Sequence, residues 1–142
     1  MSAIAILVTE AGEYLLQRRD ERPDIWFPGF VGLFGGSLED GEEPEEGLRR
    51  EIHEELGYRI REARFFTQIA FDLRRWDHGV KLVYAYEVPV TRADISTMVL
   101  YEGAGMELYG ADRVMAADRL TPYDAFVISL HLSQQIVALS PK

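Results

Sequence analysis

The sequence predicts an α/β (α+β) fold in which helices cover a mixed β-sheet, formed by a single domain over residues 1–142. Two observations lead to this prediction. Short runs rich in apolar and β-branched residues recur along the chain, with one amphipathic helix among them and a second helix after them. The chain of 142 residues is 47% hydrophobic, so it can bury a core of its own.

The first third of the chain predicts a hairpin, a loop and a short strand. Residues 3–9 (AIAILVT) and 13–19 (EYLLQRR) are expected to pair around a tight turn. Residues 20–30 hold two prolines and a glycine, which favour a loop. Residues 31–36 (VGLFGG) form a short strand that ends in a glycine pair.

A helix is predicted between Pro44 and Gly57. Proline suits the first turn of a helix, and glycine suits the left-handed residue that follows its last turn. Leu48, Ile52 and Leu56 recur every four residues and give this helix a buried side.

The second half of the chain predicts another hairpin and a closing helix. Residues 63–76 and 81–90 are expected to pair around Asp77–Gly79. Residues 106–116 predict a strand followed by a turn, and residues 121–139 predict a helix with a threonine as its N-cap.

The composition excludes several kinds of site and partner. The absence of cysteine excludes disulfides and thiolate metal sites, and it fits a cytoplasmic protein. The net charge of −9 argues against nucleic-acid polymers and anionic membranes as partners. The start, MSAIAILV, lacks basic residues and predicts a strand instead of a signal peptide, and no run approaches the ~18 apolar residues of a membrane span.

Three glutamates on the predicted helix point to a metal. Glu51, Glu54 and Glu55 project from one side, beside the apolar stripe, where a pocket wall would lie. Their repulsion weakens the helix by a few tenths of a kcal/mol per pair, and a divalent cation would remove it. Carboxylates suit Mg²⁺ or Mn²⁺. The alternative is a solvated helix face with ion pairs such as Arg50 with Glu54.

The segment around these glutamates resembles the Nudix box of the Nudix hydrolases. The box is a Gly, five residues, a Glu, seven residues, then Arg-Glu-hydrophobic-any-Glu-Glu-any-Gly-hydrophobic. Here it runs from Gly36 to Tyr58 (GSLEDGEEPEEGLRREIHEELGY), and all seven fixed positions match. Tyr58 stands where the family usually has an aliphatic residue. The resemblance implies the Nudix fold, an α/β/α sandwich around a mixed sheet with the box as loop–helix–loop. It also implies Mg²⁺-dependent hydrolysis of a nucleoside diphosphate linked to another group, with Mn²⁺ as a possible substitute.

The resemblance assigns metal-binding roles within and beside the box. The implied ligands are Glu51, Glu54, Glu55 and a backbone carbonyl of Gly35 or Gly36. Glu42 is expected near the metal, where it binds a metal-bound water or holds Arg50. Arg50 is expected to orient the glutamates through a bidentate pair instead of touching the substrate.

Further residues are candidates for catalysis and phosphate binding. Glu54 and Glu102 are the acidic candidates for catalysis, with Glu102 as an extra ligand or the general base, or else an exposed loop acid. Glu107 is a weaker rival for that role. Arg18 and Arg19 are neighbours on a strand and face opposite ways, so one of them can hold a phosphate, and we choose Arg19.

Substrate recognition has its own candidates. Trp26 and Phe27 can stack on a base or belong to the core. Asp124, at the start of the last helix, lies where MutT-like members of the family read a base edge. Its alternative role is a capping box with Thr121.

The substrate is narrowed by elimination. The ADP-ribose group of the family carries a proline about fifteen residues beyond the box, and the dinucleoside polyphosphate group carries a tyrosine slightly further on. This chain has neither. A MutT-like enzyme that converts a (d)NTP or a modified nucleotide to NMP and pyrophosphate is therefore favoured. The alternatives are a nucleotide-sugar hydrolase, a non-catalytic Nudix-fold nucleotide sensor and a plain Mg²⁺/Ca²⁺-binding protein. The expected partner is a small nucleotide, and a homodimer is possible.

Overall fold

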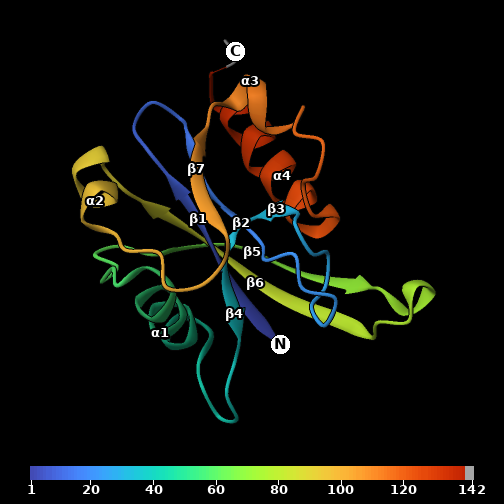
Figure 1. Cartoon of the computed structure of the whole chain (residues 1–142). Helices are drawn as coiled ribbons and strands as arrows, with labels where there is room; N and C mark the ends of the chain where they lie inside the picture. The colour runs from blue at the N-terminus through green and yellow to red at the C-terminus, as the bar shows by residue number, and fades with distance from the viewer. Residues whose placement is uncertain (140–142) are drawn as a thin grey trace.

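The computed structural model describes residues 1–139, with side-chain surroundings through residue 134, and it shows helices on both faces of a seven-stranded mixed sheet (Figure 1). The strands are β1 (Ser2–Val8), β2 (Tyr14–Arg18), β3 (Val31–Gly32), β4 (Phe34–Ser37), β5 (Arg64–Asp72), β6 (Val80–Pro89) and β7 (Gly105–Tyr109). The helices are α1 (Pro44–Leu56), α2 (Arg92–Thr97), α3 (Ala111–Val114) and α4 (Pro122–Leu139), with a 3₁₀ turn η1 at Arg74–Trp76. The predicted fold class is confirmed.

Strand β1 is the centre of the sheet. It pairs in parallel with β6 along its whole length and antiparallel with β4 and β2 on its other side. All seven of its residues are buried, as expected of an apolar run covered on both faces. Its odd-numbered residues from Ala3 to Leu7 join the core with α1, and its even-numbered residues from Ile4 to Val8 join the core with α4. This alternation creates the two layers of core.

Helix α1 follows its predicted limits. It starts at Pro44, and Gly57 closes it in the left-handed conformation with φ of 62°. Leu48, Ile52 and Leu56 are fully buried against the sheet. The last turn of the helix and the strand β4 therefore lie side by side, which places the box beside the sheet edge.

Helix α4 is fastened to the sheet through a buried histidine. His131 lies between two strands, with its Nδ1 2.7 Å from the Tyr14 hydroxyl and its Nε2 2.5 Å from a carboxylate oxygen of Glu87. This polar bridge runs through an otherwise apolar core, so it orients the helix on the sheet as well as packing it.

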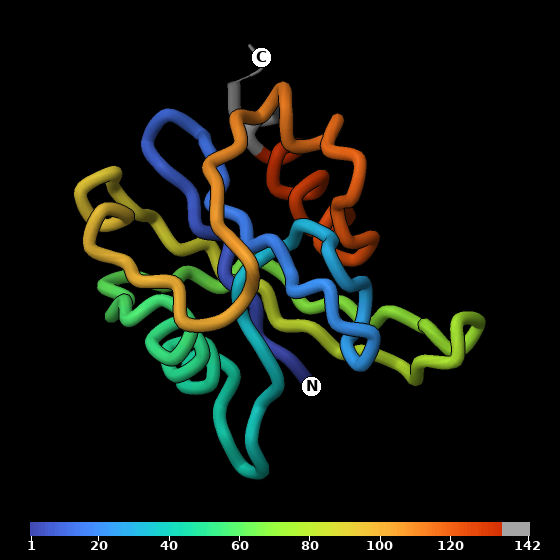
Figure 2. Tube along the Cα trace, viewed as in Figure 1, coloured from blue at the N-terminus to red at the C-terminus, as the bar shows by residue number. Residues whose placement is uncertain are grey.

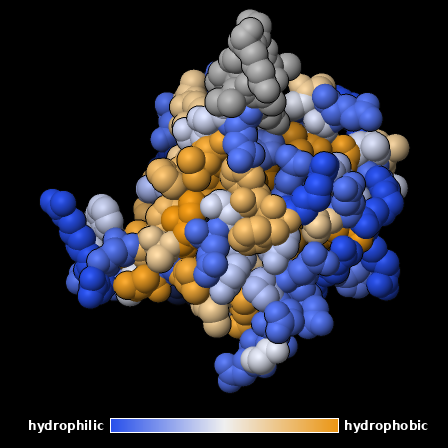
Figure 3. Space-filling model, turned by 180° about the vertical axis from the view of Figure 1, so that it is seen from behind, coloured by the Kyte–Doolittle hydropathy of each residue, from blue (hydrophilic) through white to orange (hydrophobic). Residues whose placement is uncertain are grey.

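The second predicted hairpin is confirmed as β5 and β6. Its strands end around η1, where Asp77 adopts a left-handed conformation. The hairpin extends beyond the rest of the sheet in Figure 2, and seen from behind in Figure 3 it ends in a hydrophilic tip. Strand β5 forms one edge of the sheet.

The two strands of the first predicted hairpin pair only beside their turn. Strands β1 and β2 are in register only at Val8 and Tyr14, and β2 runs along β7 instead. Strand β4 takes the stretch of β1 from Ser2 to Ala5 that a full hairpin would have used. The strand predicted over residues 31–36 is accordingly two strands, because the chain changes partner at Leu33 from β2 to β1.

Two short helices were not predicted. Helix α2 follows Thr91, which forms a capping box with Asp94, and the sequence led to no prediction there. The turn expected after β7 is the single-turn helix α3. Among residues 1–139, no helix combines the length and the apolar character needed to cross a bilayer.

The end of α1 generates a stability prediction. Gly57→Ala should lower the free energy of unfolding by about 1–2 kcal/mol, because a side chain is disfavoured at positive φ. A Cβ there would also approach the Tyr101 ring to 3.2 Å. Gly79→Ala is the matched control, since a Cβ there meets nothing within 4 Å. Urea denaturation of both variants measures this difference, and equal stabilities would contradict the assigned helix end.

Candidate active site

Glu55 lies at the rim of α1, under the first residues of β4. It is 2% exposed. One carboxylate oxygen accepts a hydrogen bond from the Gly35 backbone N–H at 3.1 Å, and the other lies 3.4 Å from the Gln17 amide nitrogen. Burial raises the pKa of Glu55 to about 8, with further contributions from the charges of Glu102 and Glu51. Glu55 is therefore buried beside other negatively charged side chains.

Glu51 lies one turn earlier and faces the next glycine. A Cβ on Gly36 would come within 2.5 Å of the Glu51 carboxyl group, so only glycine leaves it room. Burial raises the pKa of Glu51, against the lowering influence of Arg50. The glycine pair within β4 thus leaves room for the buried Glu55 and the half-buried Glu51.

Arg50 connects the acidic residues. Its Nε and one terminal nitrogen contact both oxygens of Glu42, at 2.8 and 2.9 Å. Its other terminal nitrogen donates to Glu51 at 3.0 Å and lies 3.3 Å from Glu54. A fifth contact, at 3.0 Å, joins the terminal nitrogen that contacts Glu42 to the Ser37 carbonyl oxygen. This is the bidentate, orienting arrangement expected of Arg50, and it lowers the pKa of Glu42 to about 2.

Glu54 and Glu42 differ in their exposure and in the number of their hydrogen bonds. The side chain of Glu54 is 57% exposed, and Arg50 is its ion-pair partner among the described residues. Both oxygens of Glu42 are engaged by Arg50, and one of them also accepts from the Glu39 backbone N–H. Of the two roles that the sequence left open for Glu42, holding Arg50 is therefore the one with visible contacts.

Glu102 reaches the same site from the loop before β7. Its backbone carbonyl accepts from the Gln17 amide at 2.9 Å, and its carboxylate contributes to the raised pKa values of Glu55 and Glu51. Its rival Glu107 lies on β7 and pairs with Arg113 at 2.9 Å. The structure therefore brings Glu102, and not Glu107, to the box glutamates.

A cavity of about 360 Å³ joins these acids to a second group of polar residues. Glu51 and Glu102 line it, together with Arg19, Lys81, Tyr123 and Asp124. Sequence reasoning missed Lys81 and Tyr123. The only available signal was their position, since Lys81 follows the turn of the second hairpin and Tyr123 precedes Asp124.

Asp124 is buried in the first turn of α4. It is 4% exposed, and its Oδ2 accepts from the Leu33 backbone N–H at 3.1 Å and from the Thr121 hydroxyl at 2.5 Å. Thr121 donates its own N–H to Val31, so the capping box expected as an alternative is not formed. The Oδ1 of Asp124 is buried and has no hydrogen-bond partner among the described residues. Burial raises the pKa of Asp124 to about 6.

The remaining substrate candidates lie near this second group. Arg19 lines the cavity, and its Nε donates to the Trp26 carbonyl at 2.8 Å, whereas Arg18 lines a different cavity. Trp26 lines an adjoining cavity of about 380 Å³ that also includes Arg19. Its ring lies against His78, with 4.0 Å between the centroids. Phe27 packs behind the site against Tyr123 at 5.8 Å.

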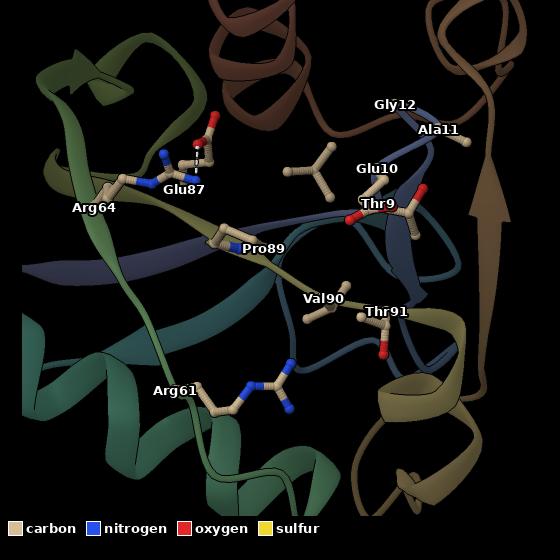
Figure 4. Close-up of a pocket in the computed structure, with 11 residues that line it drawn as sticks. Thr9, Glu10, Ala11, Gly12, Arg61, Arg64, Glu87, Pro89, Val90 and Thr91 are labelled. Atoms are coloured by element: carbon tan, nitrogen blue, oxygen red, sulfur yellow. Dashed lines mark ion pairs between the residues drawn. The ribbon is translucent and has the colours of Figure 1, made fainter.

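A larger cavity, of about 630 Å³, lies at the opposite end of the parallel β1–β6 pair (Figure 4). Val8 and Pro89, near the ends of these strands, line it, whereas Ser2 at the start of β1 lines the acidic site. The ion pair of Arg64 and Glu87 crosses its wall. Since none of the box glutamates lines this cavity, its size does not make it the candidate site.

The donor set suits a hard divalent cation. It offers carboxylate oxygens and the backbone at Gly35 and Gly36, without sulfur. In the described residues no three acidic or histidine side chains already converge on one point. The guanidinium group of Arg50 forms ion pairs with Glu51 and Glu54, so it supplies the positive charge that balances these two carboxylates. A cation can therefore bind if Glu54, which is exposed, exchanges Arg50 for it.

Comparisons with known proteins identify the family and the fold. A family model described as the NUDIX domain matches residues 1–123. The nucleoside triphosphatase NudI of Enterobacter sp. (strain 638) is 46% identical over 54 residues, which span only 38% of this chain and 38% of that protein. The MutT protein from Methanosarcina mazei Go1 superposes with a TM-score of 0.79 at 23% identity, over 94% of this chain and 93% of that one. The NUDIX domain of Shewanella oneidensis NrtR complexed with ADP ribose gives a TM-score of 0.76 at 16% identity, over 94% and 86%. Both structural likenesses concern the fold alone.

The raised pKa of Glu55 generates a pH prediction. Its folded value of about 8 exceeds its ordinary value of 4.5, so the folded state binds the proton more tightly. Without divalent cations, stability should therefore fall as pH rises from about 4.5 to 8. Glu55→Gln removes this loss and should be more stable than the native chain at pH 8.5 by on the order of a few kcal/mol, with the gap closing near pH 5.

Thermal melts across pH test this expectation. Glu46→Gln, at an exposed position of the same helix, is the control and should follow the native curve. Millimolar Mg²⁺ should stabilise the native chain at pH 8.5 but not Glu55→Gln. Parallel pH curves for all three proteins would show that Glu55 carries no buried charge.

Proposed function

This chain belongs to the NUDIX domain family, and we propose that it is a hydrolase that converts a (d)NTP or a modified nucleotide to NMP and pyrophosphate with Mg²⁺. One observation carries the proposal. A single cavity is lined by Glu51 and Glu102, which suit a cation, and by Arg19 and Asp124, whose Oδ1 has no hydrogen-bond partner among the described residues. Such a site can hold a polyphosphate and a base at the same time.

The metal would be held by residues of the box. Glu51, Glu54 and Glu55 supply carboxylates, and Gly35 supplies a backbone oxygen, while Glu42 keeps Arg50 in place. When bound, the cation supplies charge neutralisation of the phosphates and lowers the pKa of water. Arg50 is the positioning residue, because its contacts set where Glu51 and Glu54 lie.

Glu102 is proposed as the general base. It lies in a loop that is hydrogen-bonded to the end of α1, where the Tyr101 N–H donates to the Glu55 backbone oxygen. Its carboxylate can therefore accept a proton beside Glu51 and Glu55. The water oxygen forms a bond to phosphorus as its proton passes to Glu102, and the bond from phosphorus to the leaving pyrophosphate oxygen breaks.

The other end of the cavity is proposed to hold the nucleoside. Arg19 is fixed by the Trp26 carbonyl and presents its remaining nitrogens to a phosphate. Asp124 can accept a hydrogen bond from a base through Oδ1, since Oδ2 is already occupied. Trp26 supplies an aromatic face for stacking, and Phe27 packs against the ring of Tyr123. The NudI match favours a triphosphate, because that relative is named a nucleoside triphosphatase.

A substrate panel with Mg²⁺ tests the reaction. We expect release of pyrophosphate from one or more nucleoside triphosphates, and a fall in turnover of at least about 10²-fold in Glu54→Gln. Folding should be unaffected, since Glu54 is 57% exposed. Glu46→Gln is the matched control on the same helix and should keep its activity.

Three outcomes contradict parts of the proposal. Unchanged turnover in Glu54→Gln would remove the metal assignment. Cleavage restricted to nucleotide sugars would replace the substrate class. Tight nucleotide binding with no hydrolysis of any compound, ADP-ribose included, would indicate a sensor.

A further inference from the structure

Lys81 is a cation without an anionic partner in the candidate site. It is the second residue of β6, is half-buried and lines both cavities of the site. Its ammonium group lies 4.4 Å from the centroid of the Tyr123 ring and 5.2 Å from that of Trp26. No hydrogen bond or salt bridge joins it to another described residue. Three N–H donors are therefore left for a ligand.

Asp124, which lines the same cavity, has an acceptor oxygen without a hydrogen-bond donor. Its Oδ1 is buried and lacks a donor, although its Oδ2 has two. The ammonium group of Lys81 lies over the ring of Tyr123, the residue before Asp124, and no ion pair joins Lys81 to Asp124. Lys81 and Asp124 thus line one cavity, and the donor of the one and the Oδ1 of the other each lack a hydrogen-bond partner among the described residues. A polar ligand that offers both completes them.

Aromatic rings mark this end of the cavity as the place of the base. Trp26 and Tyr123 flank Lys81, whereas the box glutamates contact Gly35 and Arg50. Bases stack on aromatic faces, and pockets that take a single base read its edge through hydrogen bonds. Lys81 is therefore placed to meet the base and not the reacting phosphate.

We propose that Lys81 determines base specificity by donating to a base carbonyl oxygen while Asp124 accepts from the adjacent ring N–H. Guanine, hypoxanthine, uracil and thymine present this pair of groups. Adenine and cytosine carry an amino group where the carbonyl would be, and its N–H would face the ammonium group. Because Lys can donate but never accept, that arrangement leaves donors unpaired on both sides. The inference rests on the proposed nucleotide binding, but not on catalysis.

Lysine NMR offers a direct test, because the chain has one other lysine, Lys142. With lysine labelled at the ε-carbon, the native chain should give two side-chain signals, and Lys81→Met identifies that of Lys81. GTP and UTP, added with Ca²⁺ to limit turnover, should shift the Lys81 signal. Inorganic triphosphate, which lacks a base, should leave it in place.

Affinities complete the test. Lys81→Met should weaken binding of GTP and UTP by about 10- to 100-fold and change binding of ATP and inorganic triphosphate by less than about 3-fold. Lys81→Arg keeps a charged donor and should retain much of the selectivity, which controls for loss of packing. Equal weakening for inorganic triphosphate would assign Lys81 to the phosphates and overturn the inference, and so would unchanged affinities.

The outcome is separable from that of the proposed reaction. If nucleotides bind with the expected selectivity but are never hydrolysed, the proposed function fails and the role of Lys81 stands. If nucleotides are hydrolysed equally well by Lys81→Met whatever their base, the reaction stands and the role of Lys81 fails.

Discussion

The crowding of carboxylates at the edge between β4 and α1 is the constraint on which this site depends. Glu55 is buried beside Glu51 and Glu102, and its pKa of about 8 reflects the cost of that arrangement. Arg50 relieves part of it by reaching Glu51, while Glu42 holds the guanidinium group from the other side. Such a cluster lowers the stability of the chain unless a cation joins it, so its persistence in the fold is best explained by a ligand.

The broken strand between residues 31 and 37 connects the two ends of the site. A Cβ on Gly32 would collide with Asp124, and the next residue, Leu33, donates its N–H to the same carboxylate. Gly35 then donates to Glu55, and the following glycine leaves room for the next acid of α1. Because this segment touches α4 at one end and α1 at the other, it sets the separation of the proposed base and metal positions. The change of strand partner at Leu33 is thus part of how the site is built.

Local patterns in the sequence were sufficient for the parts of the structure that depend on neighbours in the chain. The limits of α1 follow from Pro44 and Gly57, and the spacing of the box places its glutamates on one side of the helix. Contacts between segments far apart in the sequence could not be predicted from local patterns. Nothing in the sequence around Leu33 indicates that β4 would displace β2 from β1, and Lys81 joins the site only because β6 runs beside β1. Asp124 was a candidate from its resemblance to the family, but its unpaired oxygen emerges only from its burial under β3.

The binding of Mn²⁺ in crystals, located by its anomalous scattering, tests the proposed site most directly. The ion should be found in contact with Glu51, Glu54 and Glu55, with Arg50 withdrawn from Glu51 and Glu54 but still paired with Glu42. Occupancy of another group, such as the exposed acids of residues 39–43, with Arg50 unmoved, would contradict the assignment of the box glutamates to a metal.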